Sequence, residues 1–259
     1  SKPRKLNEAE LLAKLALMSQ GSEYDIFQLA AREWHVPESQ VGDDFKAYLI
    51  EGLIPYYVNS YGFHTIHGRA PALATGLKLA NPDLDVWVVT GDGDGLSIGG
   101  NHLLHALRRN VDLNILLFNN EIYGLTKGQY SPTSRVGTTS PSSPRGSVDS
   151  PVSPGQFAMG CGTHFFARGI DTDKNGMADV LQQAHAFAGT AFVEIFQNCI
   201  VYNEDVFADF TERKTAPNTQ LHVRHGEPML FGENSGKGIR FNPDTWALEV
   251  IDAHASPED

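Results

Sequence analysis

The 259-residue chain is acidic, with 20 Lys and Arg against 31 Asp and Glu and a formal net charge of −11. That balance disfavours binding to the phosphate backbone of nucleic acid, which requires clustered cations. Two cysteines give no disulfide framework, the first residues show no signal-peptide core, and no run of about 18 apolar residues could cross a membrane, so we expect a cytoplasmic protein that binds neither nucleic acid nor membrane.

The first predicted elements are helices, because apolar residues recur at helical spacing within residues 1–20 and 24–34. From Ile54 onward the sequence becomes rich in aromatic and polar residues, and it is too irregular for a simple element. A further helix is expected after His67, because Pro71 suits the first turn of a helix.

Apolar runs and helical patterns then alternate along the chain. The predicted strands are 84–90, 113–118, 165–170 and 191–196, and the predicted helices between them are 98–109 and 177–187. Continuous apolar strands alternating with helices are typical of parallel sheets that are covered on both faces. The sequence therefore predicts an α/β fold with a doubly wound, mostly parallel sheet and helices on both faces.

A long segment rich in Ser, Pro and Gly occupies residues 130–156. Loops of more than about 15 residues inside a compact domain are usually functional lids or disordered segments. We expect an ordered loop that crosses a partner or covers a site.

Polar residues follow the first two predicted strands. Gly-Asp-Gly (91–93) ends the first run, Asn-Asn (119–120) ends the second, and 25 residues lie between the two motifs. Because the carboxyl ends of parallel strands meet at one edge of a sheet, both motifs should lie together there. Asp92, the Asn120 amide and the backbone carbonyl of Ile122 could supply hard oxygen ligands for Mg²⁺. The alternative is a plain strand-to-helix turn in which the Asp caps the helix.

These motifs resemble the thiamine diphosphate signature, in which Gly-Asp-Gly is followed after about 25 residues by Asn-Asn. The flanking sequences 61–69, 91–102, 122–129 and 197–199 look like the β subunits of 2-oxoacid:ferredoxin oxidoreductases, particularly the 2-oxoglutarate type. The resemblance runs from about Ile54 to about Val250. It implies a thiamine diphosphate-binding (PP-type) α/β domain.

The resemblance also implies a role for individual residues. Asp92, Asn120 and the carbonyl of Ile122 would hold Mg²⁺, and Leu125 and Lys127 match positions near the 2-oxoacid. His67 would lie beside these groups at the reaction centre. The residues expected to cradle the diphosphate are Gly91, Gly93, Asp94, Gly95, Thr126 and His67.

Three parts of the chain are expected on this basis. Residues 1–53 would be an atypical helical N-terminal part of the same domain, residues 54–206 the α/β core that binds thiamine diphosphate and Mg²⁺, and residues 207–259 a C-terminal extension and tail.

The implied activity is the oxidative decarboxylation of a 2-oxoacid, with 2-oxoglutarate expected, to an acyl-CoA. Thiamine diphosphate supplies the carbanion chemistry, coenzyme A accepts the acyl group and ferredoxin takes the electrons. The glutamate that activates the cofactor ring is expected on a partner α subunit, in an α2β2-type assembly.

The chain departs from the family at the iron–sulfur cluster. Family members hold a [4Fe–4S] cluster with a Cys-x-x-Cys pair near the N-terminus, a third cysteine before the stretch at Pro55 and a fourth at the position of Cys199. Here residues 1–53 contain no cysteine, and Cys161 matches no family ligand. Two alternatives therefore stand beside the oxidoreductase: a cluster-less cofactor-binding or assembly subunit of the same fold, and a non-oxidative thiamine diphosphate-dependent decarboxylase module.

Overall fold

The computed structural model describes residues 61–62, 64–224 and 226–254. The helices and the atypical N-terminal part expected within 1–53 lie outside these residues. One compact unit ends at Val206 and a second begins at Phe207. Within the described part of the chain, no helix is long and apolar enough to cross a bilayer.

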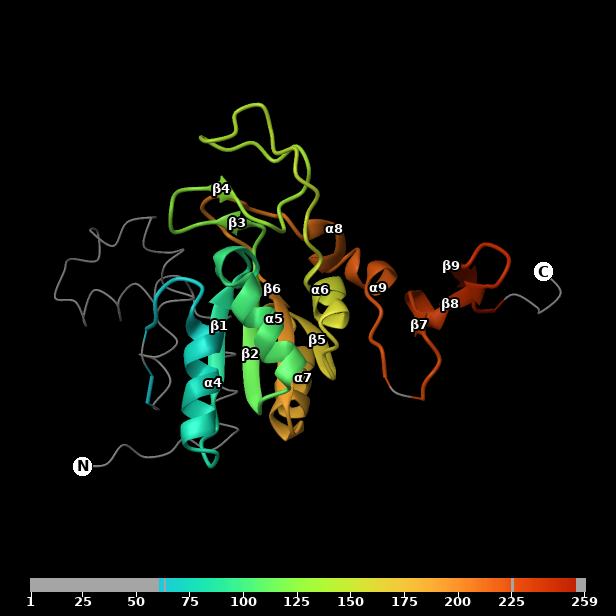
Figure 1. Cartoon of the computed structure of the whole chain (residues 1–259). Helices are drawn as coiled ribbons and strands as arrows, with labels where there is room; N and C mark the ends of the chain where they lie inside the picture. Colours follow the sequence, from blue (N-terminus) through green and yellow to red (C-terminus); the bar gives the residue numbers. More distant parts are fainter. Residues whose placement is uncertain (1–60, 63, 225, 255–259) are drawn as a thin grey trace. The chain divides into compact units, whose positions relative to one another are not determined.

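A four-stranded parallel sheet forms the centre of the first unit (Figure 1). Its strands, in spatial order, are β1 (Trp87–Gly91), β2 (Leu113–Asn119), β6 (Thr190–Phe196) and β5 (Phe165–Ile170). Every residue of β2 is buried, as expected for a strand that has neighbours on both sides and helices on both faces.

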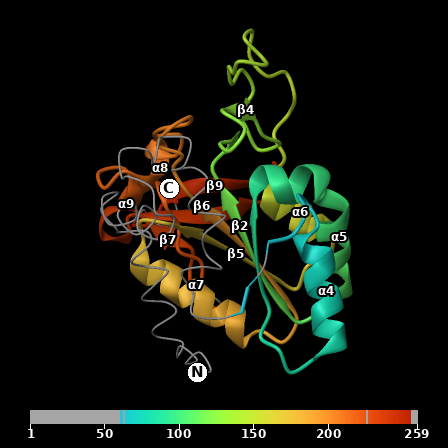
Figure 2. The same cartoon turned by 90° about the vertical axis from the view of Figure 1, so that its left-hand side faces the viewer.

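Helices cover the two faces of the sheet. The elements on one face are α4 (Ala70–Ala80), α5 (Gly100–Arg109) and α6 (Pro154–Gly160), and α7 (Lys174–Ala186) lies on the other, as Figure 2 shows. The side chains of β2 alternate between these layers: Ile115 and Leu117 pack with the first group, and Leu116 with α7. The doubly wound parallel sheet expected from the sequence is confirmed.

The link between β1 and α5 is a helical turn rather than an open loop. The chain enters a π-helical turn, η2 (Asp94–Ile98), directly after Gly93, and this turn leads into α5. The Asp94 carboxylate accepts hydrogen bonds from the Gly68 amide and the Thr90 hydroxyl, both at 2.6 Å. The helix expected over 98–109 is present as α5, and the π-helical turn before it was not predicted, because tertiary contacts of Asp94 stabilise that turn.

Two short strands lie beyond the carboxyl ends of the sheet strands. They are β3 (Ile122–Tyr123) and β4 (Gln129–Tyr130), which form an antiparallel pair. Figure 1 shows this pair on the same side of the sheet as the Ser/Pro-rich loop.

The second unit contains short helices and a small antiparallel sheet of order β7-β8-β9. Its elements are α8 (Ala208–Thr211), α9 (Ala216–Thr219), β7 (Leu230–Phe231), the 3₁₀ turn η3 (Glu233–Ser235), β8 (Lys237–Asn242) and β9 (Ala247–Asp252). From the sequence we expected only a C-terminal extension and tail here, so the β8–β9 hairpin is a feature that the structure adds.

Candidate functional site

A buried carboxylate marks the edge where the parallel strands end. Asp92 follows β1 and is 1% exposed, and its Oδ2 accepts hydrogen bonds from the hydroxyls of Ser131 and Thr133. Both hydroxyls come from the first residues of the Ser/Pro-rich segment. That segment thus closes over the acid that the sequence singled out.

Burial raises the pKa of Asp92 to about 6, because the ionised form loses its hydration. Hydrogen bonds from Ser131, Thr133 and the Gly93 amide oppose this rise but do not cancel it. These partners are neutral hydroxyls and a backbone N–H group. The site therefore favours a cation that would compensate the carboxylate, since an ionised group in such surroundings is costly when unpaired.

The Asn-Asn motif forms a tight turn beside this acid. Asn119 is 3% exposed and accepts a hydrogen bond from the Glu121 amide at 3.2 Å through its side-chain oxygen. Glu121 adopts a left-handed conformation with φ 55°. The Asn120 side-chain oxygen accepts from the Ile122 amide at 3.3 Å, and its backbone carbonyl accepts from the Asn203 side chain at 2.9 Å. The turn is therefore tethered from several directions.

Gly93 is required by a close approach. A Cβ built at this position would lie 2.2 Å from the ring of Tyr123, whose hydroxyl donates to the Gly93 carbonyl at 3.0 Å. Gly91 and Gly95 are also buried, but a Cβ at Gly95 would meet its nearest neighbour at 3.0 Å. Tyr123 thus joins the Asn-Asn turn to the start of η2.

Asp94 and His67 meet at the other side of η2. His67 Nδ1 lies 2.5 Å from Asp94 Oδ1, and the histidine side chain is 55% exposed. The structure therefore engages Asp94 with Gly68 and His67 rather than leaving its carboxylate facing outward. Its expected part in binding a diphosphate stays a prediction.

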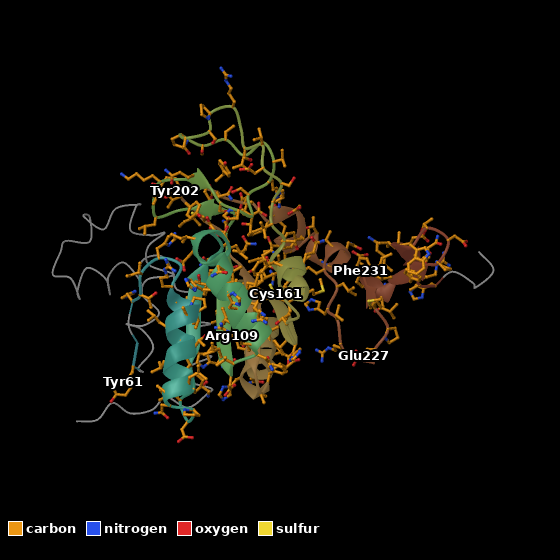
Figure 3. All side chains as sticks on the ribbon, in the orientation of Figure 1. Tyr61, Arg109, Cys161, Tyr202, Glu227 and Phe231 are labelled. Atoms are coloured by element: carbon orange, nitrogen blue, oxygen red, sulfur yellow. The ribbon has the colours of Figure 1, made fainter. Side chains whose placement is uncertain are left out.

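The residues expected near the substrate lie in the turn between β3 and β4. Leu125 and Lys127 are exposed, and the Thr126 hydroxyl donates to the Gln129 side chain. The ring of Tyr202 packs against the same turn, 3.1 Å from the position of a Cβ at Gly128 (Figure 3). The turn follows the Asn-Asn motif closely in the chain and so lies beyond the carboxyl end of β2.

The two cysteines lie at opposite ends of the sheet. Cys161 caps the end of α6 and precedes β5, whereas Cys199 is buried and follows β6. β5 and β6 run parallel over six paired residues, which separates their ends by about 20 Å. These cysteines do not fit a common metal cluster.

The residues from 46 to 195 match the model of a known family: "Thiamine pyrophosphate enzyme, C-terminal TPP binding domain". This match covers more than half of the chain. The chain belongs to the thiamine pyrophosphate enzymes.

Sequence identity to curated relatives shows which group within the family this chain resembles. It is 58% identical over 180 residues to the 2-oxoglutarate oxidoreductase subunit KorB of Mycobacterium tuberculosis, which covers 70% of this chain and 48% of that protein. It is 39% identical over 191 residues to the 2-oxoglutarate synthase subunit KorB of Methanocaldococcus jannaschii, which covers 71% of this chain and 69% of that protein. The chain is a member of this group of β subunits.

A solved structure agrees with the sequence relatives. The 2-oxoglutarate:ferredoxin oxidoreductase of Magnetococcus marinus, with 2-oxoglutarate, coenzyme A and succinyl-CoA bound, matches with 43% identity and a TM-score of 0.59, over 60% of this chain and 55% of that one. The chain spans about half the length of the first curated relatives, between 48% and 55% of each.

Several residues at the carboxyl ends of the parallel strands were not predicted from the sequence. Ser131 and Thr133 lie in a segment whose path is set by tertiary contacts, and no local pattern links them to Asp92. Glu194 did leave a signal, because it is the one charged residue in the apolar run of β6. A carboxylate in a predicted buried strand requires partners, and these could have been sought among the polar ends of neighbouring strands.

Proposed function

We propose that this chain is the β subunit of a 2-oxoacid:ferredoxin oxidoreductase and binds Mg²⁺ and thiamine diphosphate at the carboxyl ends of β1 and β2. One observation carries the proposal. Asp92 is buried, its pKa is raised to about 6 and its hydrogen-bond partners are neutral. Such a group suits a site that receives a cation.

The residues around Asp92 fit a magnesium–diphosphate group. The Asp92 carboxylate, the Asn120 side-chain oxygen and the Ile122 carbonyl are hard oxygen donors, which Mg²⁺ prefers together with water and phosphate oxygens. Gly91, Gly93 and Gly95 allow the backbone to approach the diphosphate, and amides at the start of η2 can face an anion. Asp94, Thr126 and His67 would complete the pocket for the diphosphate.

When bound, thiamine diphosphate would supply an electron sink for the decarboxylation of the 2-oxoacid. The chain's own residues orient the reactants. Lys127 pairs with the distal carboxylate of a dicarboxylic 2-oxoacid, Leu125 packs against its carbon chain and His67 lies at the reaction centre. The presence of 2-oxoglutarate, coenzyme A and succinyl-CoA in the Magnetococcus structure supports 2-oxoglutarate as the substrate.

The relatives named as β subunits support a partner α subunit, with an α2β2-type assembly, and ferredoxin as electron acceptor. The cysteines of this chain do not fit the four-cysteine cluster that the family resemblance implies, with Cys199 alone at the matching position. This mismatch favours a second candidate, a cluster-less subunit that binds the cofactor without passing electrons to ferredoxin.

The test is coexpression of the full-length chain with its α subunit under anaerobic conditions. We expect thiamine diphosphate to bind by calorimetry only when Mg²⁺ is present, and 2-oxoglutarate to be converted to succinyl-CoA with reduction of ferredoxin. Binding without ferredoxin reduction, together with a protein free of iron, would instead support the cluster-less subunit. Failure to bind the cofactor would overturn both candidates.

A further inference from the structure

A second buried carboxylate lies in the middle of β6. Glu194 is 1% exposed, in a strand whose other residues are mostly apolar. Burying a carboxylate is costly unless its oxygens are paired and hydrogen-bonded. The role of Glu194 therefore depends on which groups its two carboxylate oxygens bind.

The two oxygens of Glu194 have different partners. Oε2 accepts from the Nε of Arg168 at 2.6 Å, and Oε1 accepts from the side-chain amide nitrogen of Asn119 at 2.8 Å. Arg168 is the direct neighbour of Glu194 on β5, and Asn119 lies two residues beyond its neighbour Leu117 on β2. All three side chains are on the face that α5 and α6 cover, because strand residues alternate between faces.

Glu194 fixes the direction of the Asn119 amide. An ionised carboxylate only accepts hydrogen bonds, so Asn119 must turn its NH₂ group toward Glu194. Its oxygen then faces the Glu121 amide at 3.2 Å and the Thr133 hydroxyl at 3.0 Å. The opposite orientation would place two donors together at Glu121 and two acceptors together at Glu194.

The Asn119 oxygen acts on two sides of the proposed cation site. Its bond from Glu121 holds the turn that carries Asn120 and the Ile122 carbonyl. Its contact with Thr133 adjoins the hydrogen bond that this hydroxyl makes with Asp92. The single proton of the Thr133 hydroxyl serves either Asp92 or Asn119 at one time, so reversal of the Asn119 amide would disturb the turn and change the partner of the hydroxyl beside the acid.

We propose that Glu194 is a positioning residue for the cofactor site, which orients Asn119 and thereby preforms the Mg²⁺ ligands of the Asn-Asn turn. This rests on the proposed function, since it takes Asp92, Asn120 and Ile122 as the ligands. The positive charge of Arg168 compensates the negative charge of Glu194. The Arg168 guanidinium also lies 5.5 Å and 5.6 Å from the ring centroids of Phe166 and Phe196. The cation-binding turn is thus linked through two side chains to a partly exposed arginine on the edge strand β5 of the described sheet.

The test compares Glu194→Gln with the wild type, each as the full-length chain coexpressed with its α subunit, and titrates Mg²⁺ at a fixed concentration of thiamine diphosphate. A glutamine amide beside Arg168 turns its oxygen to the guanidinium and its NH₂ to Asn119, which forces Asn119 to reverse. Glu194 acts on the ligands only through Asn119, so Mg²⁺ affinity should fall roughly tenfold, the lower end of the range for a lost outer partner of a metal ligand. An unchanged Mg²⁺ titration in a folded Glu194→Gln protein would overturn the proposal.

A rescue variant separates positioning from general stabilisation. In Glu194→Gln/Arg168→Met no donor competes for the glutamine oxygen, which can accept from Asn119 again, so Mg²⁺ affinity should return toward the wild-type value. A purely structural role predicts the reverse, because the double variant has lost more interactions. No recovery of affinity in the double variant would count against the proposal.

Two further variants keep the test decisive. Glu194→Leu/Arg168→Met replaces the buried pair with apolar groups, a change that often preserves stability, yet it removes the acceptor for Asn119 and should still weaken Mg²⁺ binding. Normal Mg²⁺ binding in this stable variant would contradict the positioning role.

Thr190→Val, at the other end of β6, is the control that should lose stability without losing affinity. If the wild type itself binds no cofactor, the proposed function is wrong. If the wild type binds it and the Glu194 variants bind Mg²⁺ equally well, only the positioning role of Glu194 is wrong.

Discussion

The two ends of the central sheet bury polar groups in different ways. At the amino end, the Thr190 hydroxyl lies within hydrogen-bond distance of the carbonyls of Val111 (2.5 Å) and Ala106 (3.2 Å), and the Thr190 amide donates to the Asn110 side chain at 3.0 Å. At the carboxyl end, Asp92 is surrounded by neutral donors and has a raised pKa. Neutral groups satisfy one another at the amino end, whereas the carboxyl end retains a charge.

This difference separates a structural network from a binding site. The amino-end network joins α5, the turn that leads into β2, and β6 through neutral groups. Asp92 at the carboxyl end and Glu194 inside β6 are both buried, and among the described residues Arg168 pairs with Glu194. A positively charged ligand would pair with Asp92.

The largest effect is expected for Asp92→Asn. The variant keeps the shape of the side chain but removes the charge that attracts Mg²⁺, so thiamine diphosphate binding should fall by roughly a hundredfold or more. Calorimetry with and without Mg²⁺ measures this loss. Retention of Mg²⁺-dependent binding would contradict the role of Asp92.

The same variant should stabilise the ligand-free protein. A pKa raised from 3.8 to about 6 means that the folded state holds the proton more tightly than the unfolded state, so the fold loses stability as pH rises from about 4 to about 6. Above pH 6 the ionised carboxylate costs up to about 3 kcal/mol, which Asp92→Asn avoids. Urea unfolding should show a gap between variant and wild type that narrows below pH 6. A gap independent of pH would exclude Asp92 as the titrating group.

A smaller effect is expected for Gly93→Ala. Its Cβ would displace the Tyr123 ring and break the hydrogen bond to the Gly93 carbonyl, so about 1–3 kcal/mol of overpacking should lower cofactor affinity roughly five- to 150-fold. Gly76→Ala is the matched control: no atom lies within 4 Å of its Cβ on α4, and the change should stabilise the protein by about 0.5–1 kcal/mol. Equal affinities in the two variants would show that the contact with Tyr123 is not needed.

Lys127→Ala tests the outer part of the carboxyl end. Removing the charge should raise the Michaelis constant for 2-oxoglutarate roughly tenfold, through loss of a hydrogen bond to a charged group, and should change that for pyruvate much less. Steady-state kinetics with both acids measures the ratio. A parallel change for the two substrates would remove Lys127 from carboxylate recognition.

The smallest effect on binding is expected at the amino end. Thr190→Val leaves the Val111 carbonyl without its hydroxyl donor and should lower the free energy of unfolding by about 1–2 kcal/mol. Cofactor affinity should stay within about twofold, because the two ends lie too far apart to couple. A marked loss of affinity would mean that the ends of the sheet are not independent.

The sequence predicted the parallel sheet because its strands are continuous apolar runs and its helices show a clear 3.6-residue period. It also predicted that Asp92 and Asn120 follow adjacent strands, since the order of chain elements alone brings these ends together. It did not predict that Ser131 and Thr133 would close over Asp92, because a Ser/Pro-rich loop has no periodicity that fixes its path. The direction of the Asn119 amide depends on Glu194, 75 residues away, which no local pattern reveals.

The left-handed conformation of Glu121 also bears on the rate of Mg²⁺ binding. A non-glycine residue in this conformation costs about 1–2 kcal/mol, yet the turn is held by Asn119, the Ser134 hydroxyl and the Asn203 side chain on its neighbour Asn120. The protein's own hydrogen bonds therefore hold this strained conformation. A turn held in this way adds no folding step to association, so the rate of Mg²⁺ entry should be set by the slow release of water from the ion.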